Sequence, residues 1–155
     1  MGTSQDLPTI EMTDITVSGS VENTNATTTC CLGGLIAVMN EEKSDGSIHK
    51  SWDSDKGREN WQDFENERTI LNIDGLTISD FTLKNSSGAL RSSGLLGFWW
   101  LDVDATLKNV VIGEAGKPNT LNTNKRFGGL INEVTGRLIF DKVSVKYTTM
   151  KNTNS

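Results

Sequence analysis

The chain has 155 residues, 35% of them apolar, and a formal net charge of -5. This length fits one domain, and the acidic balance disfavours nucleic acid as a partner, because nucleic-acid-binding surfaces normally carry a basic footprint. The residues after Met1 are polar, so no signal peptide is visible, and the longest apolar runs are far shorter than the ~20 residues of a membrane span.

The first ordered segment begins with an apolar phrase, in which positions 1, 3, 6 and 8 are Ile10, Met12, Ile15 and Val17. This spacing fits two short strands that meet at a bend better than it fits a helix. The interruption, residues 13–14, contains an Asp, a residue type that tolerates bends. A polar linker over residues 18–29 then leads to the tetrapeptide Gly33-Gly-Leu-Ile36, whose glycines we expect to let a third strand approach its neighbour closely or to take a positive φ at a corner.

A charged insertion follows over residues 41–68, with nine acidic and five basic side chains. Trp52, Trp61 and Phe64 could form the apolar face of a short helix within it. Because insertions in solenoids project from one side, we expect its deletion to leave the repeats folded. Cys30 and Cys31, which precede the first tetrapeptide, are adjacent; neighbours in an extended segment point to opposite faces, so we interpret both as thiols.

The apolar phrase and the glycine tetrapeptide recur along the rest of the chain. The phrase returns as Leu71, Ile73, Leu76 and Ile78, as Ala105, Leu107, Val110 and Ile112, and as Leu138, Phe140, Val143 and Val145; the tetrapeptide returns at residues 93–96 and 128–131. The copies are 34 and 33 positions apart, counted from Leu71 to Ala105 and from Ala105 to Leu138. Periods of about 20 to 50 residues indicate solenoids or arrays.

The repeat predicts an all-β fold, a right-handed parallel β-helix or β-solenoid with three strands per turn. The predicted organisation is one domain over residues 1–155, with three to four repeats of roughly 33 residues. The repeats lie at about residues 10–40, 69–100, 105–136 and 137–150, and residues 79–92 and 113–126 are polar linkers. Leu76 and Ile78 should stack in register with Val110, Ile112, Val143 and Val145 in the interior.

Candidate chemistry is sparse. His49, the only histidine, lies in the insertion, which disfavours a Ser/His/Asp or Cys/His constellation. Asp102 and Asp104 would share a face with Trp100 in an extended strand, an arrangement similar to acid-plus-platform sites on polysaccharide-active β-helices. The alternative is that both aspartates are solvated turn residues. Residues 53–57 do not match an EF-hand loop and no phosphate-binding glycine loop is present, so we predict no metal and no cofactor.

Three consecutive aromatic residues, Phe98, Trp99 and Trp100, should alternate between the two faces of a strand. At least one should therefore lie outside the core or under the insertion. An exposed tryptophan offers a flat platform for a sugar ring or a partner protein, whereas a covered one would cap the core. The candidate ligand-binding residues are Trp52, Trp61, Trp99, Trp100, Asp102 and Asp104.

Residues 93–110 and 127–136 resemble repeats of very large secreted β-helix proteins of anaerobic, gut-type bacteria, which look like adhesins or cell-surface stalks. The resemblance covers residues 69–145 well and residues 10–40 loosely. It implies an extracellular or cell-surface location, a non-enzymatic role as a stalk or an adhesive, carbohydrate-binding surface, and a glycan or a host or cell-surface protein as partner. The alternative is a polysaccharide lyase or hydrolase on the same fold, which would need two or more carboxylates and a basic residue in one groove.

The two ends of such a solenoid would expose unpaired strand edges, which recruit other chains. Neither the first eight residues nor those after Tyr147 look like an apolar cap. We therefore expect either flanking repeats of a longer parent protein or end-to-end self-association, with residues 10–17 and 138–145 nearest the contacts.

Overall fold

The computed structural model describes residues 7–24, 32–39, 69–85, 93–123 and 128–152. They form one sheet of eight strands: β1 (Thr9–Asn23), β2 (Leu32–Gly33), β3 (Val38–Met39), β4 (Thr69–Asn85), β5 (Ser93–Ile112), β6 (Asn119–Thr123), β7 (Gly129–Val145) and β8 (Thr148–Asn152). Every pairing between these strands is parallel. The described part contains no helix, which confirms the predicted all-β class for these residues.

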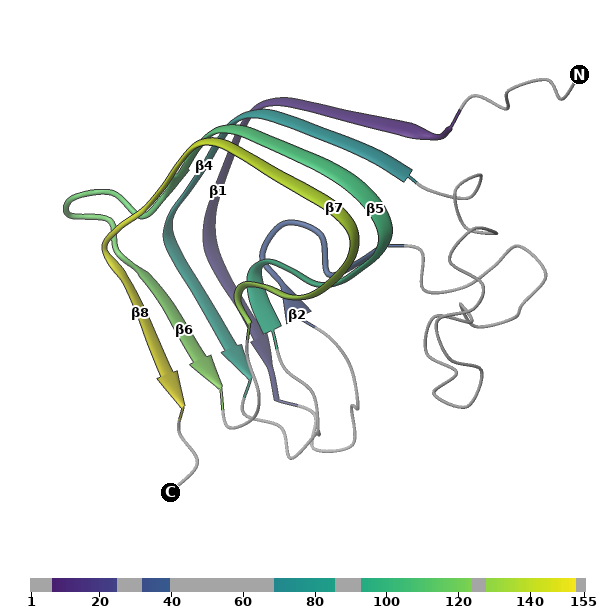
Figure 1. The fold of residues 1–155 in the computed structure, drawn as a ribbon. Coiled ribbons are helices and arrows are strands. Elements are labelled where there is room, and N and C mark those ends of the chain that lie inside the picture. Colours follow the sequence, from purple (N-terminus) through teal and green to yellow (C-terminus); the bar gives the residue numbers. More distant parts are fainter. Residues whose placement is uncertain (1–6, 25–31, 40–68, 86–92, 124–127, 153–155) are drawn as a thin grey trace, which may run out of the picture.

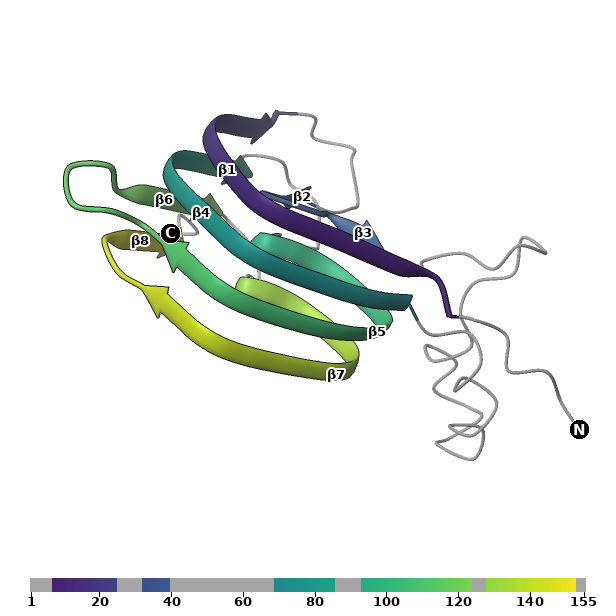
Figure 2. The ribbon, with the colours of Figure 1, turned by 90° about the horizontal axis from the view of Figure 1, so that it is seen from above.

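The sheet is curled rather than flat (Figure 1), because the long strands bend at shared corners. β1, β4, β5 and β7 run side by side around the curl, and Figure 2 shows the same strands stacked from above. The apolar core fills the concave side and comes mainly from β4 and β5. We divide the curl into three sides, each made of segments that repeat along the chain.

The first side consists of residues 9–17, 69–78, 103–112 and 136–145, and it carries the apolar phrase. The four copies pair position for position: Ile10 with Leu71, Ala105 and Leu138; Met12 with Ile73, Leu107 and Phe140; Ile15 with Leu76, Val110 and Val143; Val17 with Ile78, Ile112 and Val145. The predicted register is therefore confirmed. The two central copies are fully buried at these positions, whereas Val145 in the last copy is 45% exposed.

Each first-side segment bends at one residue with a left-handed backbone. These residues are Asp14 (φ 53°), Gly75 (φ 80°), Asn109 (φ 52°) and Lys142 (φ 55°), the second residue of every interruption. In a regular strand the side chains alternate, so positions 3 and 6 of the phrase would face opposite ways. The left-handed residue adds one position at the corner and brings both inward. Gly, Asn and Asp are the residue types that visit this conformation most readily.

The second side consists of residues 19–23, 81–85, 119–123 and 148–152, which pair in that order. The prediction that residues 18–29, 79–92 and 113–126 are linkers is wrong for these stretches. Three of these strands place one strongly apolar residue on the inward face, as at the fully buried Leu121, and only residues 81–85 place two, Phe81 and Leu83. A single apolar residue gives no alternation to detect, and two give a very short one, so periodicity alone missed these strands.

The third side consists of residues 32–39, which include β2 and β3, of residues 93–100 on β5, and of residues 128–134 at the start of β7, and it holds the glycine tetrapeptides. Gly33, Gly94 and Gly129 are in register. A Cβ added to Gly94 would lie 2.4 Å from the carbonyl oxygen of Leu130, which is closer than real Cβ contacts. The expected role of glycine in close strand approach is therefore confirmed at this position.

Several sequence predictions fall outside the described residues. They include the insertion at residues 41–68, its expected short helix, and the two cysteines, Cys30 and Cys31. Among the residues that the structure does describe, no helix is long and apolar enough to cross a membrane.

Candidate functional site

The candidate residue Trp100 lies in the core. Its side chain is fully buried, and its indole Nε1 donates a hydrogen bond of 3.0 Å to the carbonyl oxygen of Ile36 on the third side. The ring therefore has no exposed face for a ligand, and its polar atom is satisfied within the fold. Trp99 also lies on β5, but its side chain is not described, and Trp52 and Trp61 lie outside the described residues.

Asp104 does not share a face with Trp100. The pairing of β5 with β7 shifts between Trp100 and Val103, and both of these residues are fully buried. Two inward residues three positions apart show that the alternation changes phase at this corner. The expectation of a common face is wrong for Asp104, which points outward, because it assumed an unbroken strand. The side chain of Asp102, within the corner, is not described.

Asp104 is instead bonded to the next copy of the repeat. Its Oδ1 accepts a hydrogen bond of 3.1 Å from the backbone N–H of Arg137, and its Oδ2 lies 3.8 Å from the Arg137 guanidinium. These contacts join β5 to β7 on the outer face of the first side. Asp104 therefore has a structural role that neither sequence alternative anticipated.

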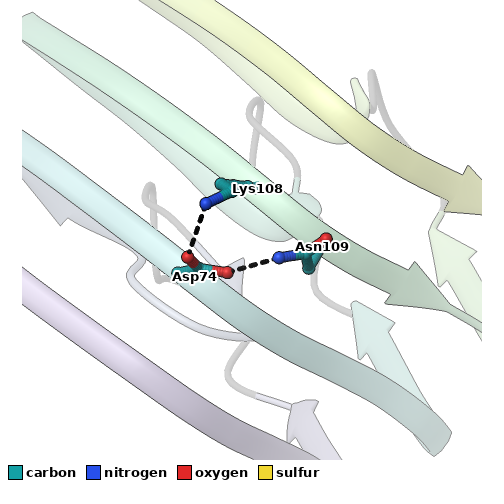
Figure 3. Close-up of polar contacts among 3 residues, drawn as sticks. All are labelled: Asp74, Lys108 and Asn109. Carbon is teal, nitrogen blue, oxygen red and sulfur yellow. Dashed lines mark hydrogen bonds and ion pairs between the residues drawn. The ribbon is translucent and has the colours of Figure 1, made fainter.

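A second outward cluster lies at the corner of the first side and consists of Asp74 on β4 with Lys108 and Asn109 on β5 (Figure 3). Asn109 donates a hydrogen bond of 2.6 Å from Nδ2 to Asp74 Oδ1, and Lys108 Nζ lies 3.1 Å from Asp74 Oδ2. Both oxygens of Asp74 thus have a partner in the following copy. The side chains of Asp74 and Lys108 remain about half exposed, at 48% and 45%.

The electrostatics of Asp74 fit a cross-link better than a catalytic group. The hydrogen bond from Asn109, followed by the contact with Lys108, holds the pKa of the Asp74 carboxyl below its usual range. A carboxyl with a lowered pKa is ionised at neutral pH, so it cannot donate a proton, and it is a weak base. What the cluster can do is hold two neighbouring strands in register.

Similar bonds join other copies on the outer face. Glu22 on β1 forms an ion pair of 2.6 Å with Lys84 on β4. In the column that contains Asp74 and Lys108, the next paired residue is Asp141, so the sign of the charge alternates along the stack. Opposite charges directly across neighbouring strands stabilise a sheet, and like charges destabilise it. The outer face is therefore organised by interactions between copies.

Comparison with known proteins gives no match. No family model matches the sequence, and no curated protein or solved structure matches the chain. The interpretation therefore depends on the residues themselves. Among the described residues, no group of three or more His, Cys, Asp or Glu side chains could hold a metal ion.

Sequence reasoning missed Asp74, Lys108, Asn109 and Arg137. The signal was nonetheless present, because the fourth position of successive copies of the phrase reads Asp74, Lys108 and Asp141. Aligned copies with alternating charge at one position predict contacts between neighbours in a stack. Patterns within a single segment do not reveal these contacts, because each contact joins two copies.

Proposed function

We propose that the chain is a right-handed parallel β-helix, or β-solenoid, module of three to four repeats in a secreted or surface-anchored, adhesin-like bacterial protein. In this proposal it acts as a stalk or as an adhesive surface and is not an enzyme. The observation that carries the proposal is the register of the first side, in which four copies of one phrase pair position for position. A fold that repeats by stacking extends in one dimension, as a stalk requires.

The bonds between copies support a mechanical role. The ladder hydrogen bonds between the strands run along the stacking direction, with neighbouring strands ~4.8 Å apart. Side-chain bonds such as Asp74 to Asn109 and Glu22 to Lys84 add links in the same direction. A load along the stack is therefore shared by many parallel bonds. Pulling single molecules from both ends should give one high-force unfolding event for the described copies, and stepwise low-force loss of copies would contradict a stalk.

The proposed location can be tested directly on cells. Antibodies raised against the folded chain should label intact cells of the organism that encodes it. Antibodies against a cytoplasmic marker should label the same cells only after permeabilisation, which makes that marker the control. Labelling that requires permeabilisation for both proteins would contradict a surface or secreted location.

The proposed partners of the adhesive surface are a glycan or a host or cell-surface protein, bound through the candidate tryptophans and carboxylates. The candidates are Trp52, Trp61, Trp99 and Asp102, whose side chains lie outside those described, and Asp104. We expect binding to a glycan array, with loss of the signal in Trp52→Ala and Trp61→Ala variants. Trp100→Ala is not a useful variant because Trp100 is in the core. A chain that binds no glycan and no host surface would support the stalk role alone.

The alternative function is that of a polysaccharide lyase or hydrolase. One observation favours it: the Asp104 carboxylate, on the strand that also contains Asp102, and the Arg137 guanidinium on β7 lie together on the outer face. Incubation with acidic and neutral polysaccharides should nevertheless release no reducing ends and no unsaturated products. Turnover that is lost in Asp104→Asn would favour the enzyme over the stalk or adhesin.

A further inference from the structure

The two ends of the stack carry opposite charge. The first copy, over residues 7–24, has three acidic side chains, Glu11, Asp14 and Glu22, and no Lys or Arg. The last copy, over residues 136–152, has the four basic side chains Arg137, Lys142, Lys146 and Lys151 and the single acidic residue Asp141. All eight of these residues are exposed. The chain therefore has an acidic edge at β1 and a basic edge at β7 and β8.

Both edges also expose apolar side chains. Ile10 and Val21 on β1 are 37% and 38% exposed, and Phe140, Val145 and Met150 on β7 and β8 are 49%, 45% and 40% exposed. Their counterparts in the central copies, such as Leu71 and Leu83, are fully buried. Within the described part of the chain, β1 pairs only with β4 and β8 only with β6. At each edge, the apolar side chains that are buried in the central copies are therefore exposed. One further copy of the repeat would cover them.

We propose that the acidic β1 edge of one copy of this chain docks on the basic β7–β8 edge of a second copy, in the register that continues the columns of the stack. The inference rests on the stacked architecture in the proposed function. It does not depend on whether the module is a stalk, an adhesin or an enzyme, nor on its location. We assign a second copy of this chain as the partner because its β1 strand carries acidic and apolar residues. These complement the basic and apolar residues of the β7–β8 edge.

The continued register puts apolar residues on apolar residues. On the first side, Phe140 meets Met12 of the second copy, Val143 meets Ile15, and Val145 meets Val17; on the second side, Met150 meets Val21. These pairs follow from the observed columns, in which Met12, Ile73, Leu107 and Phe140 already share one position. The docking would bury the side chains that are exposed at both edges, and burial of apolar surface favours association.

The charges in the same register are complementary. Lys151 meets Glu22 of the second copy from the side opposite Lys84, with which Glu22 forms an ion pair of 2.6 Å within one chain. Lys142 meets Asp14 at the left-handed corner, and Asp141 meets the neutral Thr13. No like charges face each other in these columns. Asn152 meets Asn23, as Asn85 does within the chain, where the Asn23 Nδ2 to Asn85 Oδ1 distance is 3.4 Å.

The contact involves the first and second sides only. The third side ends one copy earlier than the other two sides. Its last strand is the first half of β7, which belongs to the same copy as β6, whereas β8 belongs to the copy after it. The two edges are different surfaces, so the contact is heterologous and leaves an acidic edge free on one molecule and a basic edge free on the other. Such contacts build open-ended chains rather than closed dimers.

Sedimentation velocity or light scattering over a concentration series tests the proposal. At low salt the average mass should rise continuously with concentration, and at about 1 M salt the association should weaken, because added salt screens exposed charges. The variant Lys142→Asp with Lys151→Glu should associate at least about tenfold more weakly, since both pairs become like-charged. Asp is used at position 142 because Asp14 adopts the same backbone conformation.

A charge swap provides the decisive test. The variant Asp14→Lys with Glu22→Lys should also fail to associate alone, but an equimolar mixture of the two double variants should recover the association. Lys117→Glu, in the loop between β5 and β6, changes an exposed charge away from both edges and should have no effect. Circular dichroism checks that each variant is folded, and the salt series on the unmodified chain tests the proposal without any variant.

Two results would overturn the proposal. One is an unmodified chain that stays monomeric at high concentration and low salt. The other is an association that neither double variant weakens or that the mixture does not restore. Both results are independent of cell labelling, pulling or glycan binding, so failure here is distinguishable from failure of the proposed function.

Discussion

The central strands β4 and β5 and the edge strands β1 and β7 share one sequence phrase but differ sharply in burial. Ile78 and Ile112 are fully buried, whereas Val145, at the same position of the last copy, is 45% exposed. Ile10 is likewise 37% exposed, and its neighbour in the column, Leu71, is fully buried. Burial in this fold is therefore supplied by the neighbouring copies and not by the local sequence, as expected for a stack of nearest neighbours.

The largest difference in stability between a central and an edge substitution should appear when a charge is introduced. Val110 is fully buried between Leu76 and Val143. Val110→Asp should cost several kcal/mol and abolish cooperative unfolding, because it buries a charge among apolar side chains. Val145→Asp, at the edge, should cost less than about 1 kcal/mol. Urea unfolding monitored by circular dichroism measures both, and equal stability of the two variants would show that the copies do not shield one another.

A buried polar bridge should come next in magnitude. Asn119 is fully buried. Its Nδ2 donates a hydrogen bond of 2.8 Å to the carbonyl oxygen of Ile78, and its Oδ1 accepts a hydrogen bond of 3.1 Å from the backbone N–H of Phe81. Asn119→Ala should cost about 1–3 kcal/mol, since it leaves the buried backbone N–H of Phe81 unpaired. The carbonyl oxygen of Ile78 still accepts a bond of 2.7 Å from the backbone N–H of Gly113.

The matched edge variant for this bridge is Thr148→Ala. Thr148 pairs with Asn119 in the register but is only partly buried, and its hydroxyl bonds the carbonyl oxygen of Lys146 at 3.0 Å. Its loss should cost no more than about 1 kcal/mol, because the freed groups can bond water. Equal losses for the two variants would argue that the Asn119 bridge is not a central element of stability.

Two glycines at equivalent corners give a smaller and more specific contrast. Gly113 and Gly19 both have positive φ, at 83° and 104°. A Cβ on Gly113 would lie 1.9 Å from the carbonyl oxygen of Lys146, whereas a Cβ on Gly19 meets nothing within 4 Å. Gly19→Ala should cost only the left-handed penalty of about 1–2 kcal/mol, and Gly113→Ala should cost more because it also clashes with the next copy. Identical melting temperatures for the two variants would contradict this stacking contact.

The smallest expected effect is the pH dependence of the Asp74 cluster. Its pKa is lowered from the ordinary value of 3.8 by Asn109 and Lys108, so the ionised form favours the folded state. This contribution is present above pH 3.8 and is lost as the pH falls through the lowered folded pKa. The stability difference between the unmodified chain and Asp74→Asn should therefore shrink as the pH is lowered.

A double-mutant cycle with Asn109→Ala sharpens this test of the Asp74 cluster. The two substitutions should be non-additive at pH 7, because they remove the same hydrogen bond. The ionic part of the effect should weaken in high salt, since Asp74 and Lys108 are both about half exposed. A stability difference that stays constant from pH 7 to pH 2 would show that ionisation of Asp74 is not the cause.

The sequence predicted the all-β class and the register of the first side because four copies of one phrase specify both. It also indicated the corners, since Asp14, Gly75 and Asn109 are residue types that accept a left-handed backbone. It could not indicate that the inward and outward alternation of side chains changes phase between Trp100 and Val103. The residues there are almost all apolar or aromatic, so they show no polar–apolar alternation whose break would mark the change. That change alone placed Asp104 on the opposite face from the one expected.

The second-side strands were hidden for a different reason. Each has a short pattern of a hydroxyl residue, an apolar residue, a polar residue and an Asn or Thr, as in Thr82-Leu-Lys-Asn85 and Thr120-Leu-Asn-Thr123. One apolar residue in four reads as a loop when a segment is taken alone. Only the neighbours in the stack make these residues a strand, because they complete the hydrogen-bond ladder. The same dependence on neighbouring copies hid the links made by Asp74 and Arg137.

The left-handed corner of the last copy has a consequence for selection on this chain. Three of the four corner residues are Asp, Gly and Asn, but the fourth is Lys142, a residue type with no local reason to adopt φ 55°. A left-handed backbone costs an ordinary residue about 1–2 kcal/mol, so asparagine or glycine at this corner would give a more stable chain. A substitution that sacrifices folding energy persists most readily where it contributes something else. The proposed docking would supply such a contribution at position 142, because it places this positive charge opposite Asp14 of the next molecule, so that the corner would trade stability for recognition.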